Sequence, residues 1–209
     1  MKRMLLLSFM TLSLSFTSSL FAQPRTMSVE HLTTGQSYFN VTVADSGLLK
    51  GSYPGWCADW TTRIVDGTVY NSRFYSSLSS TIPGDVVDHP ENLDEVNWLI
   101  NKMFVGKASP SGLGVYTTGD VQLAIWTLID NEFESSSVGP FSQPRVDELV
   151  ARAKVDGANY HPKCRELVGI ILVPSDPQTG AGSQNTIILV PRYHFHKCAV
   201  PDSDEGTRK

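Results

Sequence analysis

The sequence predicts an α+β fold, in which a β-sandwich or β-barrel carries an inserted helical subdomain. Segments rich in β-branched and aromatic residues lie in the first and last parts of the chain. Between them, over about 92–156, apolar residues recur at helical spacing. The 209 residues, of which 41% are hydrophobic, are enough for one sizeable core.

The first residues are typical of a secretory signal peptide. Lys2 and Arg3 provide a basic start, an apolar stretch follows, and Ala22 is a small residue at a plausible cleavage point. We therefore expect residues 1–22 to be removed and the protein to be secreted. We expect one domain over 23–200, and a disordered tail over 201–209, which is polar and charged.

Three strands are expected before the helical part. Residues 36–44 are rich in β-branched and aromatic types, and 56–65 and 67–75 look like two further short strands. Asp66-Gly67 between the last two is a turn signal. Residues 77–90 are rich in Ser, Pro and Asp, so we expect a loop there.

Three helices are expected next. The first follows Asn92 as N-cap and extends to about Met103. The second, 121–133 with Asp120 as its cap, is apolar nearly all round and therefore buried. The third covers about 145–154 and is amphipathic.

Two strands are expected to close the fold. They cover 167–173 and 186–190, and each is followed by a proline, Pro174 or Pro191. Residues 193–198 are expected to extend the last strand past a bulge.

The three cysteines are Cys57, Cys164 and Cys198. In an oxidising compartment two of them would pair. Cys164 and Cys198 stand in similar polar settings and flank the last two strand-like segments, so we predict a disulfide between them. Cys57 is then left over, and such a cysteine is intermolecular, buried and inert, or chemically engaged.

Gln122 is the second unusual residue, because it is an amide expected in the first turn of a helix that is otherwise apolar. A buried amide needs partners for its carbonyl and N–H groups, or it costs about 1–3 kcal/mol. The fold must therefore either satisfy this amide or consume it.

Two short motifs resemble those of the thioester domains of Gram-positive surface adhesins and related secreted proteins. Trp56-Cys57 matches the aromatic-Cys motif, and residues 121–126, Val-Gln-Leu-Ala-Ile-Trp, match the apolar-Gln-x-x-apolar-apolar motif. The resemblance covers roughly 35–190. It implies a β-sandwich or barrel with a helical subdomain, and an internal thioester between the Cys57 sulfur and the Gln122 side-chain carbonyl carbon.

The implied chemistry is covalent capture. A Lys amine, or another nucleophile on a partner surface, would attack the thioester and release the Cys57 thiol. This is a single binding event, so we expect no enzymatic turnover. Trp56 and Trp126 could exclude water, and Asp59 could orient a proton acceptor from the same strand face as Cys57.

Several classes of function are disfavoured. The formal net charge of −4 and the lack of a long basic stretch disfavour a nucleic-acid partner, and no apolar run after the signal could span a membrane. We expect no cofactor and no metal site. The alternative function is a non-covalent extracellular β-sandwich with an inert Cys57, in which Tyr70, Phe74 and Tyr75 are stacking residues or a core face.

Overall fold

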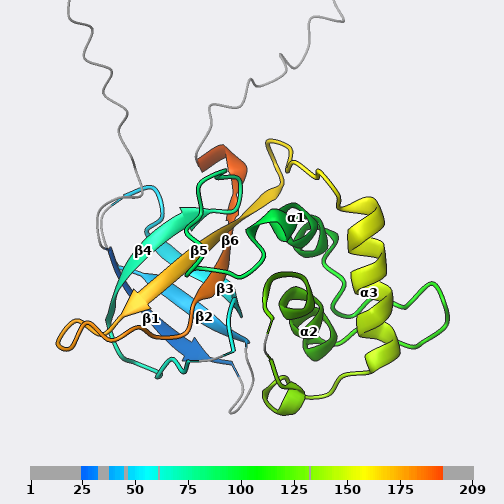
Figure 1. Ribbon diagram of the computed structural model, residues 1–209, viewed down its shortest axis with the longest axis horizontal. Helices are drawn as coiled ribbons and strands as arrows, with labels where there is room; N and C mark the ends of the chain where they lie inside the picture. Colours follow the sequence, from blue (N-terminus) through cyan, green and yellow to red (C-terminus); the bar gives the residue numbers. More distant parts are fainter. Residues whose placement is uncertain (1–24, 33–37, 45–46, 61, 132, 195–209) are drawn as a thin grey trace, which may run out of the picture.

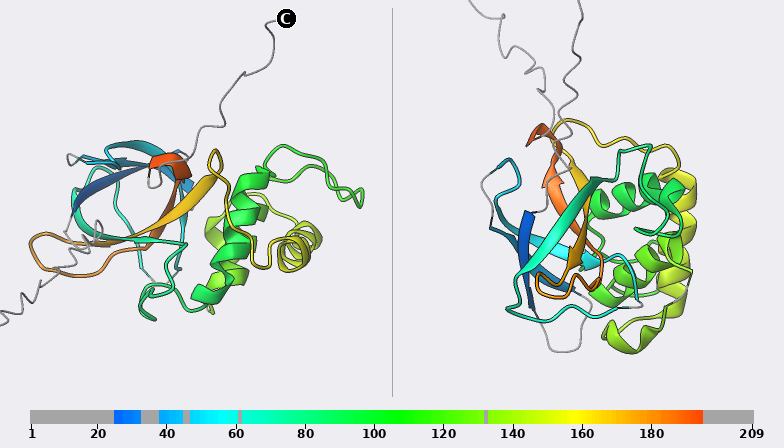
Figure 2. Two further views of the ribbon diagram at one scale, coloured as in Figure 1. Left: turned by 90° about the horizontal axis from the view of Figure 1, so that it is seen from above. Right: turned by 60° about the vertical axis from the view of Figure 1, so that its left-hand side comes forward.

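The computed structural model describes residues 25–32, 38–44, 47–60, 62–131 and 133–194. A closed antiparallel barrel of six strands lies beside three helices, and one continuous hydrophobic core joins the two parts (Figures 1 and 2). The α+β class is confirmed, with a barrel rather than a sandwich. That the helices form a separate subdomain stays a prediction.

The barrel closes in the order β1-β2-β3-β6-β5-β4, with every neighbouring pair antiparallel. Its strands are β1 (Arg25–His31), β2 (Tyr38–Val43), β3 (Gly51–Cys57), β4 (Tyr70–Ser76), β5 (Leu167–Ser175) and β6 (Thr186–Pro191). Closure leaves the sheet without a free edge, so every strand has a partner on both sides.

Side chains along a barrel strand alternate between the apolar interior and the outside of the barrel. In β2, Phe39, Val41 and Val43 are buried while the residues between them are exposed, as expected for a strand with one face on the core. In β5 most residues are buried, because the helix α1 packs on this strand.

The helices are α1 (Leu93–Lys102), α2 (Thr118–Ile129) and α3 (Gln143–Asp156), and all three lie between β4 and β5 in the chain. Three short 3₁₀ turns cover Pro90–Asn92, Ser135–Ser137 and Arg192–His194. Figure 1 shows α2 beside the barrel, with α3 on the far side of α1 and α2. None of the helices in the described part of the chain is both long and apolar enough to cross a membrane.

Two strand predictions were wrong. No strand was expected over 25–31, where β1 lies, and the strand expected over 56–65 ends at Cys57. The strand β3 instead begins at Gly51 and contains Pro54, which lacks the N–H that a strand interior normally uses. The turn at Gly67 is confirmed, since its φ of 71° is a left-handed conformation that favours glycine.

The predicted helix caps were also wrong in part. Asn92 precedes α1 but makes no side-chain cap; its Nδ2 instead donates to the Leu128 carbonyl oxygen at 2.7 Å. The helix α2 begins earlier than expected, with Thr117 as N-cap, so Asp120 is its third residue rather than its cap.

The C-terminal strands differ in detail. Pro174 lies within β5 rather than after it, and Arg192–His194 forms a 3₁₀ turn where a strand extension was expected. The predicted signal peptide (1–22), the tail (201–209) and the remainder of the 193–198 extension lie outside the described residues.

Candidate functional site

Cys57 is the last residue of β3, and its thiol is buried, with 1% of the residue exposed. It has the same side-chain direction as Gly55, which faces Phe39 and Val41 in the barrel interior. The Cys57 side chain is therefore held by a rigid strand. It points into the barrel interior, at the end of the barrel where β3 stops.

Gln122 is also 1% exposed and lies on α2, a full turn past the first helical residue, Thr118. The expectation that it occupies the first turn was wrong, because the helix begins earlier. Since the helix dipole acts mainly within the first turn, it acts only weakly on this amide.

Two reciprocal hydrogen bonds join the Gln122 side chain to the Cys57 backbone. The Cys57 N–H donates to Gln122 Oε1 at 3.0 Å, and Gln122 Nε2 donates to the Cys57 carbonyl oxygen at 2.9 Å. The residues are 65 positions apart in the sequence. The carboxamide thus occupies the side of Cys57 where a neighbouring strand would otherwise pair.

The aromatic residues near this pair form two separate clusters. Trp60 meets the ring of Trp126 edge to face, with centroids 5.7 Å apart, and Phe133 stacks on Trp126. Trp56 packs instead against Tyr38 at 5.0 Å. Because Trp126 follows Gln122 by one helical turn, its ring covers the same face of α2 as the carboxamide.

Asp59 does not share a strand face with Cys57, because β3 has ended before it. Its carboxylate accepts hydrogen bonds from the Asn185 N–H at 2.6 Å and from the Thr62 hydroxyl at 3.2 Å. The pKa of Asp59 is raised to about 6, mainly by burial and to a smaller extent by the charge of Asp130, while those hydrogen bonds oppose the rise.

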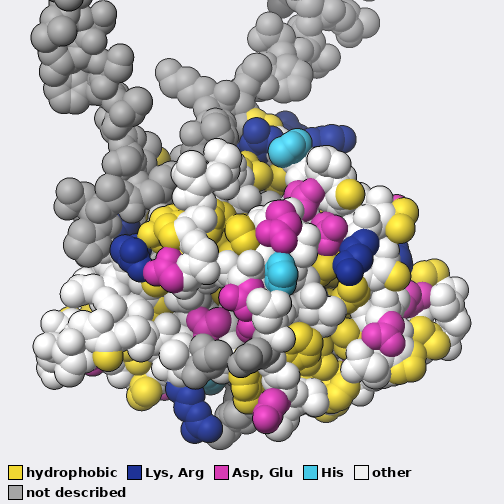
Figure 3. Space-filling model, viewed as in Figure 1, with side chains coloured by type: hydrophobic (Ala, Val, Ile, Leu, Met, Phe, Trp, Pro, Cys, Tyr) yellow, Lys and Arg dark blue, Asp and Glu magenta, His cyan; other side chains and the backbone are white. Residues whose placement is uncertain are grey.

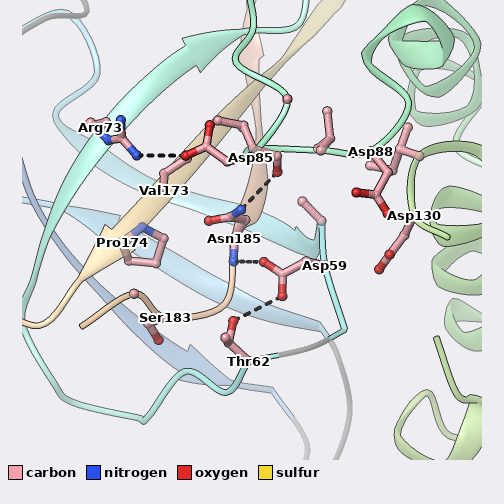
Figure 4. Close-up of a pocket in the computed structure, with 16 residues that line it drawn as sticks. Asp59, Thr62, Arg73, Asp85, Asp88, Asp130, Val173, Pro174, Ser183 and Asn185 are labelled. Carbon is pink, nitrogen blue, oxygen red and sulfur yellow. Dashed lines mark hydrogen bonds and ion pairs between the residues drawn. The ribbon is translucent and has the colours of Figure 1, made fainter. Parts of the chain in front are cut away.

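A pocket of about 350 Å³ begins directly after Cys57, at Ala58 and Asp59. Figure 4 shows its carboxylates, which come from three separate segments of the chain, together with Arg73, whose guanidinium lies 4.0 Å from the Asp85 carboxylate. Figure 3 shows acidic side chains gathered across the middle of this face, where the barrel meets the helices. In the described part of the chain, no group of three His, Cys or acidic residues is placed to hold a metal ion.

Sequence reasoning did not find Asp130 and Asn185 as pocket residues. Asp130 is the C-cap of α2 and accepts a hydrogen bond from the Trp60 N–H at 3.0 Å, and Asn185 immediately precedes β6. These residues meet only through the tertiary fold, so no local pattern could have paired them.

The remaining residues that the sequence singled out take no part in the contact between Cys57 and Gln122, or lie outside the described residues. Tyr70 and Phe74 are buried in the core, so they are not stacking residues on the surface. Cys198 lies outside the described residues, and its disulfide with Cys164 stays a prediction.

Comparison with known proteins adds one distant likeness. No family model matches the chain, and no curated protein matches it. Among solved structures, the N-terminal thioester domain of fibronectin-binding protein SfbI from Streptococcus pyogenes is similar at 13% sequence identity and a TM-score of 0.43. The match covers 79% of this chain and 92% of that chain. Likeness at this level does not establish family membership.

Proposed function

We propose that this protein is a secreted binding module that couples covalently to a nucleophile on a partner surface. The reactive group is an internal thioester between the Cys57 sulfur and the Gln122 side-chain carbonyl carbon. The contact between the Gln122 carboxamide and the Cys57 backbone carries this proposal.

Proximity is the first support. The two hydrogen bonds fix the carboxamide against Cys57, and the sulfur is only three bonds from the amide nitrogen that holds Gln122 Oε1. Holding two reacting groups together in this way replaces a bimolecular encounter by an intramolecular step. A strand end and a buried helix supply the rigidity.

The direction of one hydrogen bond also suits the chemistry. When the Cys57 sulfur attacks the carboxamide carbon, negative charge develops on Oε1, which the Cys57 N–H already contacts at 3.0 Å. A backbone donor aimed at a developing oxyanion stabilises the tetrahedral intermediate. The carbon–nitrogen bond then breaks, and the nitrogen leaves as ammonia with the proton that the thiol lost.

Burial would protect the product. Cys57 and Gln122 are each 1% exposed, and Trp126 covers the next turn of the helix. Excluding water slows hydrolysis of a thioester and leaves it available for a better nucleophile. A Lys amine of the partner would then form an amide with the Gln122 acyl carbon, and the Cys57 thiol would be released.

The function is binding rather than turnover, because each molecule can react once. The N-terminal segment 1–22 supports secretion, where a partner surface would present its amines. Adhesion through a covalent bond is the corresponding biological role.

The alternative is a non-covalent binding domain in which Cys57 is inert, and one observation favours it. Asn101 makes the same reciprocal pair with the Leu167 backbone, donating to its carbonyl oxygen at 2.8 Å and accepting from its N–H at 2.7 Å. No cysteine takes part there, so this arrangement can be purely structural. The covalent proposal therefore has to be tested by reactivity.

Methylamine distinguishes the two functions, because it is small enough to probe a buried acyl group. The covalent proposal predicts that the secreted protein gains one methylamine at Gln122 and that Cys57 becomes available for alkylation. Cys57→Ala and Gln122→Ala should gain nothing, whereas Asn101→Ala should react like the wild type. A wild-type protein that takes up no methylamine would leave the non-covalent alternative.

A further inference from the structure

Thr186, the first residue of β6, lies directly opposite Cys57 in the antiparallel pairing of β3 and β6. Residues directly opposite each other have their side chains on the same face of the sheet. The Ala58 N–H donates to the Asn185 carbonyl oxygen at 2.8 Å, and the Cys57 N–H is used by Gln122. Cys57 and Thr186 therefore form a non-hydrogen-bonded pair, the type in which opposite side chains approach most closely.

The Thr186 hydroxyl is both buried and unused. Thr186 is 0% exposed, and its Oγ1 has no hydrogen-bond partner among the residues that the structure describes. Leaving a buried hydroxyl unsatisfied costs free energy, and folded proteins satisfy the large majority of such groups. Valine has nearly the same shape without this cost and is equally at home in a strand, so packing alone does not account for a threonine here.

We propose that Thr186 is a catalytic residue whose hydroxyl acts directly on the Cys57 sulfur, and this inference rests on the proposed thioester function. Its hydroxyl donates a hydrogen bond to the sulfur as the thiol proton leaves and negative charge develops. The sulfur–carbon bond then forms, the carbon–nitrogen bond of Gln122 breaks, and ammonia carries the proton away. In the later attack by an amine, the same hydroxyl stabilises the departing sulfur.

The hydroxyl and the Cys57 N–H have separate tasks in this scheme. The N–H stabilises charge on Gln122 Oε1, and the Thr186 hydroxyl stabilises charge on the sulfur. Each reacting atom that becomes negative would then have its own donor, fixed in place by β3 or β6.

Thr186→Val tests this role, with Thr186→Ser as the conservative variant. Thr42→Val, the same change on the exposed face of β2, is the matched control. Intact mass gives the fraction of each protein that has lost ammonia, methylamine uptake gives the rate of acyl transfer, and thermal unfolding gives stability. We expect Thr186→Val to melt no lower than the wild type and yet to react with methylamine at least about tenfold more slowly, as expected when a hydrogen bond to a charged group is lost. Serine should restore most of the rate.

Three outcomes decide the matter. A Thr186→Val protein that loses ammonia and takes up methylamine like the wild type would overturn the role of Thr186 and leave the thioester intact. A slow Thr186→Ser protein would also overturn it, because a hydroxyl alone would then be insufficient. A wild-type protein that has lost no ammonia would instead overturn the proposed function, and the inference with it.

Discussion

Asp120 on α2 and Arg145 on α3 form an ion pair, with a fully buried carboxylate, that fixes the start of the helix bearing Gln122. Arg145 Nε lies 2.6 Å from Asp120 Oδ2, and Arg145 Nη2 donates to Oδ1 at 3.3 Å. Asp120 is 0% exposed and also accepts hydrogen bonds from the Thr117 and Ser142 N–H groups, each at 2.7 Å. One carboxylate therefore closes the capping box of α2 and joins it to the start of α3.

Removing this carboxylate should destabilise the protein strongly. Asp120→Ala leaves Arg145 without its partner and two backbone N–H groups without an acceptor, so we expect a loss of about 3–5 kcal/mol in the free energy of unfolding. Urea denaturation measures it. Asp147→Ala makes the same change at an exposed position on α3 and should cost less than about 0.5 kcal/mol. Equal losses in the two variants would contradict the role assigned to Asp120.

The pH dependence of stability should contain a contribution from Asp59. Its pKa is about 6 in the folded protein against 3.8 ordinarily, mainly because burial disfavours the charged form. The folded state therefore holds this proton more tightly, and the contribution is fully present below about pH 4 and lost as the pH rises through about 6.

Asp59→Asn should remove that contribution. We expect the stability of the wild type relative to this variant to fall by about 2 kcal/mol between pH 4 and pH 6. Chemical denaturation at a series of pH values measures the difference. Asp85→Asn removes an exposed carboxylate from the same pocket and should retain the wild-type fall. A constant difference between wild type and Asp59→Asn would rule out a shifted titration.

A side chain at position 55 should destabilise the barrel, because β2 packs directly against Gly55. A Cβ there would lie 2.7 Å from Val41 Cγ2 and 3.2 Å from Phe39 Cδ2 in the barrel interior. We expect Gly55→Ala to cost about 1–3 kcal/mol in thermal or urea unfolding. Gly84→Ala, where a Cβ would meet no atom within 4 Å, should be close to neutral. A fully stable Gly55→Ala variant would show that the strands separate more easily than their packing indicates.

The spacing of apolar residues along the chain correctly predicted those helices and strands that contain many apolar residues. The helical spacing of apolar residues in α1 and α2, and the β-branched runs of β5 and β6, are local patterns that tertiary contacts only reinforce. By contrast, β1 has only two buried apolar side chains, Met27 and Val29, so its alternation is too short to be distinctive.

Strand β3 was misplaced because its sequence opposes strand propensity. Gly51, Pro54 and Gly55 are residues that strands usually avoid. They are accommodated because β2 and β6 supply the partners, and because the crowded barrel interior beside Phe39 requires a glycine at position 55.

The site shows the same division between local and non-local information. The two motifs identified Cys57 and Gln122 as residues of interest, but the direction of their hydrogen bonds depends on how α2 meets the end of β3. Thr186 could not be selected from the sequence, since its significance follows from strand register alone.

The most direct test is the intact mass of the purified, secreted protein. The account predicts a mass about 17 Da below that of the processed chain, the loss of one ammonia on forming the thioester. The deficit should vanish in Cys57→Ala and in Gln122→Ala and persist in Asn101→Ala. A wild-type protein of full mass, with a Cys57 thiol that alkylates once the chain is unfolded, would contradict the thioester.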